Sequence, residues 1–143
     1  YYNYYCSHHY YKYIYLEKFP SVNKPLNNYL ISHKSELIGR KIRKFNNDNW
    51  FEWGALRNYK TIKNRLGDDC IYVSNLTRSS DVCFKDKVQL FGGTLIIMIP
   101  KKEIDISKVV NYINSQMFKE NYMYSGRFKI GHKQLCNCRA EFV

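Results

Sequence analysis

The stretch Asn49-Trp-Phe-Glu-Trp-Gly-Ala-Leu-Arg-Asn58 holds both tryptophans of the chain. Two indole rings and a phenyl ring within four residues bring a large apolar surface that folding must bury or a partner must cover. Two interpretations follow. The rings form a core seam, or the segment also presents Arg57 and Asn58 to a partner. The charge and the other motifs of the chain bear on which interpretation holds.

The length and the charge limit what the chain can be. Its 143 residues suffice for one domain with a real core, and are too few for a catalytic domain plus a recognition domain. The net charge is +11, which favours a polyanionic partner, with nucleic acid first among them. A basic surface that serves only solubility is the alternative.

The five cysteines are odd in number and scattered, unlike a disulfide framework. Cys136-Asn-Cys138 beside His132 has half the ligands of a zinc site and lacks the second pair, so no metal is expected. Neither a membrane span nor a signal peptide is indicated. We therefore expect a reducing, intracellular setting, the cytoplasm of a prokaryote or a viral factory.

Eight of the first fifteen residues are tyrosine, and the chain begins with Tyr1. We expect residues 1–17 to be a lead-in or an edge strand, because tyrosine favours strands, although tyrosines also stack on bases. Residues 18–143 are expected to form the functional domain, as a fragment of a longer protein.

The periodicity predicts an α+β fold, with a small mixed or antiparallel sheet and two main helices packed on it. One helix is expected over 25–44, with Pro25 in its first turn, and the other over 106–117, capped by Asp105. Strands are expected over 70–76 and 82–84 as a hairpin. The apolar run 94–99 is expected to be a central strand buried on both faces.

Three stretches carry candidate contacts to a polyanion. Arg40, Arg43 and Lys44 follow the first helix, where they suit either the helix dipole or phosphates. The polar stretch 77–81 offers hydroxyls and Arg78 for a turn or for phosphates. Between Gly126 and Gly131, alternation puts Arg127 and Lys129 on one face of a short strand. The opposite face would be apolar.

Four pieces in register also resemble the C-terminal target-recognition region of site-specific, adenine-specific DNA methyltransferases of restriction-modification systems. They are Asn49–Gly54 with Arg57 and Asn58; Ile71–Val73 with Thr77 and Arg78; Phe91–Leu95 running to Ile99–Lys101; and Ser125–Leu135. The resemblance covers roughly 19–138. It implies a transferase whose other half binds S-adenosylmethionine and methylates the amino group of adenine, while this half reads the duplex.

The sequence excludes the catalytic part of that activity from this chain. The Asn or Asp-Pro-Pro-aromatic motif of amino-methylating enzymes is absent, and Gly92-Gly93 precedes a strand rather than joining a strand to a helix. We therefore predict no catalytic residue and no cofactor in this chain. The fragment alone is expected to be inactive.

The function predicted from sequence is recognition of double-stranded DNA next to a missing methyltransferase domain. Arginine matches guanine bidentately and glutamine matches adenine, while lysine and histidine reach phosphates. The predicted DNA-binding residues are Arg40, Arg43, Lys44, Arg57, Asn58, Lys60, Arg78, Arg127, Lys129, His132, Lys133 and Gln134. The alternatives are a basic RNA-binding module and a protein-interaction domain anchored by Trp50 and Trp53.

Overall fold

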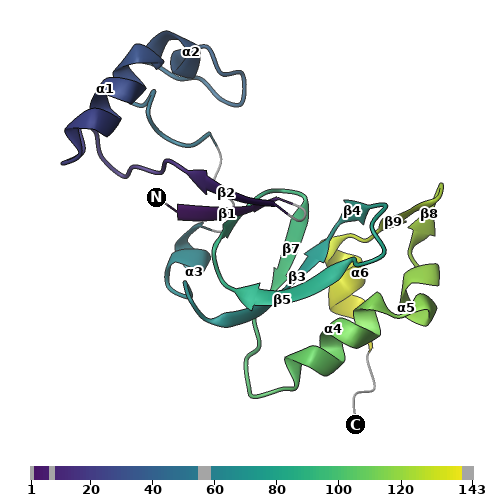
Figure 1. Cartoon of the computed structure of the whole chain (residues 1–143). Coiled ribbons are helices and arrows are strands. Elements are labelled where there is room, and N and C mark those ends of the chain that lie inside the picture. The colour runs from purple at the N-terminus through teal and green to yellow at the C-terminus, as the bar shows by residue number, and fades with distance from the viewer. Residues whose placement is uncertain (1, 7–8, 55–58, 140–143) are drawn as a thin grey trace. The chain divides into compact units, whose positions relative to one another are not determined.

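The computed structural model describes residues 2–6, 9–54 and 59–139, and it confirms the α+β class (Figure 1). The chain divides into two compact units. The first comprises Tyr1–Tyr2 and Lys12–Asn58, and the second comprises Asn3–Tyr11 and Tyr59–Val143. Each unit is described by itself below. Within the described residues, no helix has the length and the apolar character to cross a membrane.

The first unit contains helices α1 (Lys24–Ser32) and α2 (Lys34–Ile38). Asn23 caps α1, because its side chain accepts a hydrogen bond from the Leu26 N–H at 2.9 Å. The single helix predicted over 25–44 is wrong. His33 interrupts it with a non-helical backbone, and Gly39 ends it with its N–H bonded to the Ser35 carbonyl. The basic residues 40–44 therefore lie in a loop.

The core of the first unit is built around Trp50, which is only 3% exposed. The Phe19 ring meets the Trp50 ring edge-on with centroids 4.8 Å apart, and Phe45 and Leu30 are buried as well. The Trp53 Nε1–H donates to the Ile14 carbonyl at 2.8 Å. The core-seam interpretation is thus confirmed for Trp50, which is not an exposed anchor.

The second unit is organised on an antiparallel sheet of order β5-β3-β7. Its strands are β3 (Asp69–Ser74), β5 (Cys83–Lys87) and β7 (Leu95–Met98). Strand β3 is buried along five of its six residues, and it pairs with β5 from Asp69–Lys87 to Val73–Cys83. The predicted pairing of the two segments is confirmed. The predicted central place of 94–99 is wrong, because β7 is an edge strand and most of its side chains are half-buried.

Helix α4 (Ile106–Asn114) packs on β3 and β5. Asp105 caps it as predicted, accepting from the Lys108 N–H at 3.2 Å. The helix ends at Asn114, three residues before the predicted bound. Ser115 then caps the separate helix α5 (Gln116–Glu120), which leaves Met117 65% exposed.

A second antiparallel sheet has the order β4-β9-β8. Its strands are β4 (Leu76–Thr77), β8 (Met123–Tyr124) and β9 (Arg127–Lys129). The hairpin from β8 to β9 turns through Ser125 and Gly126, both with positive φ (48° and 71°). The core continues from β3 through α4 to Phe128, Ile130 and Leu135, so this sheet is fixed to the central one.

The remaining elements are short and belong to the second unit, except that Tyr2, Lys12 and Tyr13 belong to the first. A third sheet has the order β2-β1-β6, with β1 parallel to β6. Its strands and the two remaining helices are β1 (Tyr2–Cys6), β2 (His9–Tyr13), β6 (Leu90–Phe91), α3 (Tyr59–Lys63) and α6 (His132–Asn137).

Candidate nucleic-acid interface

Strand β9 separates an apolar face from a basic one, as its sequence predicts. Phe128 is 2% exposed in the core, while Lys129 is exposed and Arg127 half-exposed. Register pairs Arg127 with Tyr124 and Lys129 with Leu76, so these four side chains share the outer face of the sheet. The Lys129 ammonium lies over the Tyr124 ring, 5.3 Å from its centroid.

A cavity of about 180 Å³ opens between β4, β9, the loop that follows β4, and α5. We call it the cationic cavity, because three of its lining residues are Arg78, Lys119 and Arg127 and no aspartate or glutamate lines it. The other lining residues are Thr77, Ser79, Val82, Gln116, Met123, Gly126 and Phe128. Three positive charges therefore meet at one small hollow without a carboxylate among its walls.

The Nε atom of Arg127 is buried and has no hydrogen-bond partner among the described residues. Within the described residues, Arg78, Lys119 and Arg127 also form no ion pair. A buried N–H of a charged group without an acceptor is costly, and native proteins rarely leave one unmatched. An acceptor for this N–H has to come from beyond the described residues.

The loop 77–81 is held in shape by its own hydroxyls. Thr77 Oγ1 accepts from the Ser79 N–H at 3.0 Å, and Ser79 Oγ accepts from the Asp81 N–H at 3.3 Å. These bonds confirm the predicted turn and leave each hydroxyl proton available as a donor. The Lys119 ammonium donates to the Ser80 carbonyl at 2.9 Å, which connects the loop to α5.

Helix α4 fixes the far end of the same loop through Asn114. The Asn114 side-chain oxygen accepts from the N–H groups of Val82 and Cys83 at 2.9 and 3.0 Å. Its amide nitrogen donates to the Cys83 carbonyl at 2.7 Å. The loop is therefore positioned by two helices before any ligand arrives.

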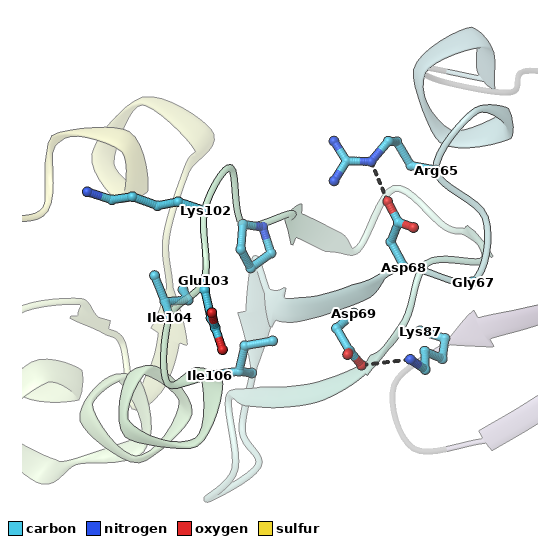
Figure 2. A pocket seen from close by; sticks show the side chains of 10 residues that line it. Arg65, Gly67, Asp68, Asp69, Lys87, Lys102, Glu103, Ile104 and Ile106 are labelled. Carbon is cyan, nitrogen blue, oxygen red and sulfur yellow. Dashed lines mark hydrogen bonds and ion pairs between the residues drawn. The ribbon is translucent and has the colours of Figure 1, made fainter.

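A larger cavity of about 480 Å³ in the second unit differs in its charge balance (Figure 2). Three basic and three acidic residues line it, and two of the three basic residues are in ion pairs with acidic neighbours. Arg65 bonds to Asp68, and the Lys87 ammonium lies 3.0 Å from the Asp69 carboxylate. That Lys87 hydrogen bond lowers the pKa of Asp69. This cavity has little net attraction for a polyanion.

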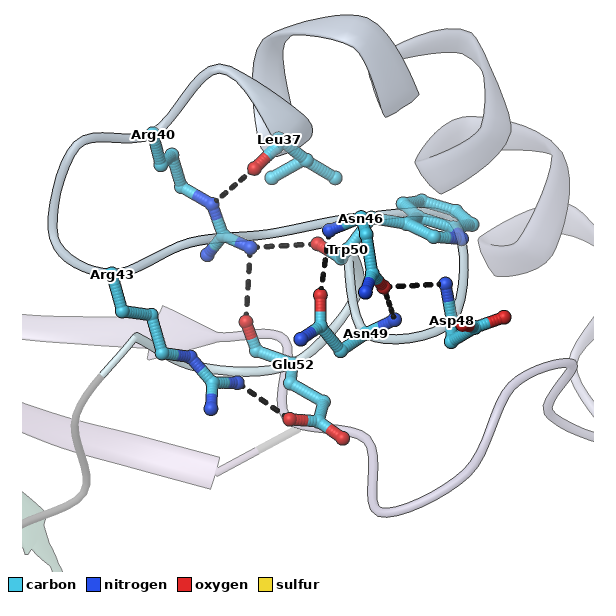
Figure 3. Close-up of polar contacts among 8 residues, drawn as sticks. All are labelled: Leu37, Arg40, Arg43, Asn46, Asp48, Asn49, Trp50 and Glu52. Atoms are coloured by element: carbon cyan, nitrogen blue, oxygen red, sulfur yellow. Dashed lines mark hydrogen bonds and ion pairs between the residues drawn. The ribbon is translucent and has the colours of Figure 1, made fainter.

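The arginines of the first unit have partners inside the protein (Figure 3). The Arg40 guanidinium donates to the carbonyls of Leu37, Trp50 and Glu52 at 2.8, 2.6 and 3.0 Å. It also lies 3.9 Å from the centroid of the buried Phe45 ring. Burial, followed by the neighbouring charge of Arg43, lowers the pKa of Arg40 from its usual value.

Arg43 pairs with Glu52, and both side chains are partly exposed. Its guanidinium also lies 4.9 Å from the centroid of the Phe45 ring. We call Arg40, Arg43, Phe45 and Glu52 the Arg40 cluster. In this cluster the arginines bond to carbonyls and a carboxylate of their own unit, including the Trp50 carbonyl. In the cationic cavity the basic side chains line an open hollow.

The other predicted residues are distributed over both units. Lys44 is exposed in the first unit, and Lys60 is exposed on α3 in the second. Helix α6 begins with His132, Lys133 and Gln134, all exposed, and the Gln134 side-chain oxygen accepts from the Gly131 N–H at 2.8 Å. Arg57 and Asn58 lie outside the described residues. No contact with DNA is tested by these placements, so the predicted roles stay predictions.

The cysteines in the core are not nucleophiles. Burial raises the pKa of Cys83 to about 12 and that of Cys70 to about 11, so both thiols stay protonated at neutral pH. The Cys136 sulfur lies 3.7 Å from the His132 Nδ1. Among the described residues, no group of three histidine, cysteine or acidic side chains is placed to hold a metal ion.

Two polar residues of the site were missed by sequence reasoning. Lys119 and Gln116 line the cationic cavity from α5, a helix that the sequence pattern merged with its predecessor. Ser115 was the available signal, because a serine before a new apolar turn is a typical helix start.

The chain is similar to the Type II methyltransferase M.MjaIV of Methanocaldococcus jannaschii, with 33% identity over 115 residues. The aligned region is 79% of this chain and 37% of that protein, so the chain spans little more than a third of its relative's length. The similarity relates this chain to a methyltransferase. No family model matches the chain, and no solved structure matches it significantly.

Proposed function

We propose that this chain recognises double-stranded DNA, as the target-recognition part of an adenine-specific DNA methyltransferase of restriction-modification type. The similarity to a Type II methyltransferase supports the enzyme class. The four sequence pieces that resemble target-recognition regions support the role of this part. The catalytic domain would receive the flipped adenine, and this chain would hold and read the duplex beside it.

The observation that carries the proposal is the unneutralised charge of the cationic cavity. Arg78, Lys119 and Arg127 line it with no carboxylate, and the buried Arg127 Nε has no partner among the described residues. The larger cavity of the same unit differs, because acidic residues equal basic ones in number there and Arg65 and Lys87 each have a carboxylate partner. DNA phosphates are the acceptors that such a cavity fits.

The outer face of the sheet β4-β9-β8 supplies groups that can read bases. Lys129 and the 62% exposed Tyr124 lie on it, and the major groove of DNA admits a β-ribbon. The Phe128 ring in the core keeps β9 from shifting in register, since a slip of one residue would bury the lysine. Lys133 and Gln134 extend the polar surface onto the first turn of α6.

This chain does not fit S-adenosylmethionine. Gly92 and Gly93 form a turn between β6 and β7, where the Leu95 N–H bonds to the Gly92 carbonyl, and no helix follows to receive a cofactor. The three prolines stand in Phe19-Pro20-Ser21, Lys24-Pro25-Leu26 and Ile99-Pro100-Lys101, outside any amino-methylating motif. We therefore assign cofactor binding and methyl transfer to a domain beyond this chain.

Binding of labelled nucleic acids, followed by fluorescence anisotropy from about 50 to 200 mM salt, tests the proposal. We expect duplex DNA to bind more tightly than a single strand of the same sequence. With about six phosphate contacts, log K against log salt should have a slope on the order of −5. Tighter binding to single-stranded DNA or RNA would favour the RNA-binding alternative instead. A flat slope would favour a protein partner.

A further inference from the structure

We infer that the cationic cavity is a receptor for a single phosphate group of the DNA backbone, with Lys119 as one of its ligands. The inference rests on the proposed function and adds to it the chemistry of one subsite. It also changes the expected role of Arg127, from hydrogen bonding to a guanine base to contact with a phosphate of the DNA backbone.

The size of the cavity selects the ligand. At about 180 Å³ it is smaller than the 300 to 1,000 Å³ typical of sites that enclose drug-sized molecules, so it cannot enclose a nucleoside. A tetrahedral phosphate group with part of its hydration shell fits. The cavity need not enclose its ligand completely, because a phosphate stays attached to the duplex outside.

 

The donors around the cavity match phosphate oxygens. Arg78 and Arg127 present planar guanidinium groups that bind phosphate in a forked geometry, and Lys119 adds a point charge. The hydroxyls of Thr77 and Ser79 line the same wall, with their oxygens already occupied as acceptors from backbone N–H groups. Each hydroxyl keeps its proton as a donor, which suits an anion.

The subsite is held in place before the anion arrives. The Lys119 ammonium uses one of its three protons on the Ser80 carbonyl at 2.9 Å, which leaves two for a phosphate. The acidic groups nearest in sequence do not close the cavity. Asp81 is exposed, and the Glu120 carboxylate accepts from the Gln116 amide at 2.8 Å.

The test compares salt slopes of duplex binding for the full chain and four variants. They are Arg78→Ala, Lys119→Ala, the double variant of both, and Lys108→Ala as a control. Lys108 is exposed on α4, in the same unit, and does not line the cavity. The control therefore makes the same change of charge as each single variant, at another place. Circular dichroism checks that each variant is folded.

We expect the double variant to lose about 0.9 from the magnitude of the slope, the amount for one phosphate on B-DNA, equally for duplexes of unrelated sequence. Lys108→Ala should keep the slope of the unchanged chain. A loss of about 1.8 would place the two cations on separate phosphates and overturn the single-phosphate subsite. A slope of the double variant equal to that of Lys108→Ala would overturn the subsite as well.

Arg127→Ala provides a second, independent readout. A phosphate contact predicts equal weakening for every duplex sequence, and weakening confined to one sequence would make Arg127 a base-reading residue. These failures differ from failure of the proposed function. If the unchanged chain binds duplex DNA without preference or salt dependence, the function itself is wrong, whatever the variants do.

Discussion

The Arg40 cluster and the cationic cavity are both rich in positive charge, but they use it in opposite ways. Arg40 donates to three backbone carbonyls at 2.6 to 3.0 Å, and Arg43 pairs with Glu52. Around the cavity, Arg127 leaves a buried N–H without a partner among the described residues, and no carboxylate lines the walls.

The comparison shows that the number of cations in a segment does not measure its affinity for a polyanion. A guanidinium that already satisfies carbonyls must break those bonds before it can bind a phosphate, and each bond to a charged group contributes about 1.5 to 3 kcal/mol. A guanidinium without partners has no such bonds to lose. We therefore propose that the Arg40 cluster mainly stabilises the fold and that the cationic cavity mainly binds DNA.

The largest effect is expected for Phe128→Ala, which removes the apolar support of β9. Phe128 is 2% exposed, and loss of a buried phenyl ring costs about 3 to 5 kcal/mol. Urea unfolding followed by circular dichroism should show this loss for the second unit. The fluorescence of Trp50 and Trp53, which both lie in the first unit, should keep its midpoint. Unchanged stability would contradict the buried position of the ring.

Arg40→Ala should lower the free energy of unfolding of the first unit by about 3 kcal/mol, because three carbonyls lose a charged donor. Urea unfolding followed by tryptophan fluorescence measures this directly. Arg40→Lys is the matched control that keeps the charge. Arg40→Lys should restore little of the lost stability, since an ammonium cannot reproduce the planar set of donors of a guanidinium. Full stability in both variants would show that the cluster is dispensable for the fold.

Arg127→Ala should weaken binding to every duplex sequence alike, by up to about tenfold, the amount for losing one phosphate contact at about 100 mM salt. The free energy of unfolding should change by no more than about 1 kcal/mol, since the side chain has no ion pair to lose in the described part of the chain. Anisotropy at fixed salt and urea unfolding separate the two quantities. A lower free energy of unfolding with unchanged duplex affinity would contradict the binding role of Arg127.

The smallest effect is expected for Arg43→Ala. Its pair with Glu52 is partly exposed on both sides, and such pairs contribute about 0.2 to 1 kcal/mol. Tryptophan fluorescence in urea should detect a shift of that size at most. A much larger loss would mean that the stacking of Arg43 on Phe45 carries more of the core than the ion pair does.

The sequence was most informative where a pattern is local. The alternation of Arg127, Phe128 and Lys129 predicted the two faces of β9, and Asp105 predicted the start of α4. These features depend on neighbours within four residues, which periodicity and capping describe directly.

Features that depend on distant partners were not predictable. An apolar run such as 94–99 looks the same in a central strand and in an edge strand, and only pairing with β3 places it at the edge. The bonds of Arg40 reach carbonyls ten and twelve residues away, so its charge reads as available when the sequence is considered alone. Lys119 likewise enters the cavity only through the bend at Ser115.

The most direct test of the central claim compares Arg78→Ala with Arg43→Ala in binding to one duplex at about 100 mM salt. Each variant removes one arginine and one positive charge from a chain of net charge +11. The account predicts that Arg78→Ala weakens binding by up to about tenfold, the amount for losing the whole phosphate contact at this salt, while Arg43→Ala stays within about twofold of the unchanged chain. A larger loss for Arg43→Ala than for Arg78→Ala would contradict it and return DNA binding to the Arg40 cluster.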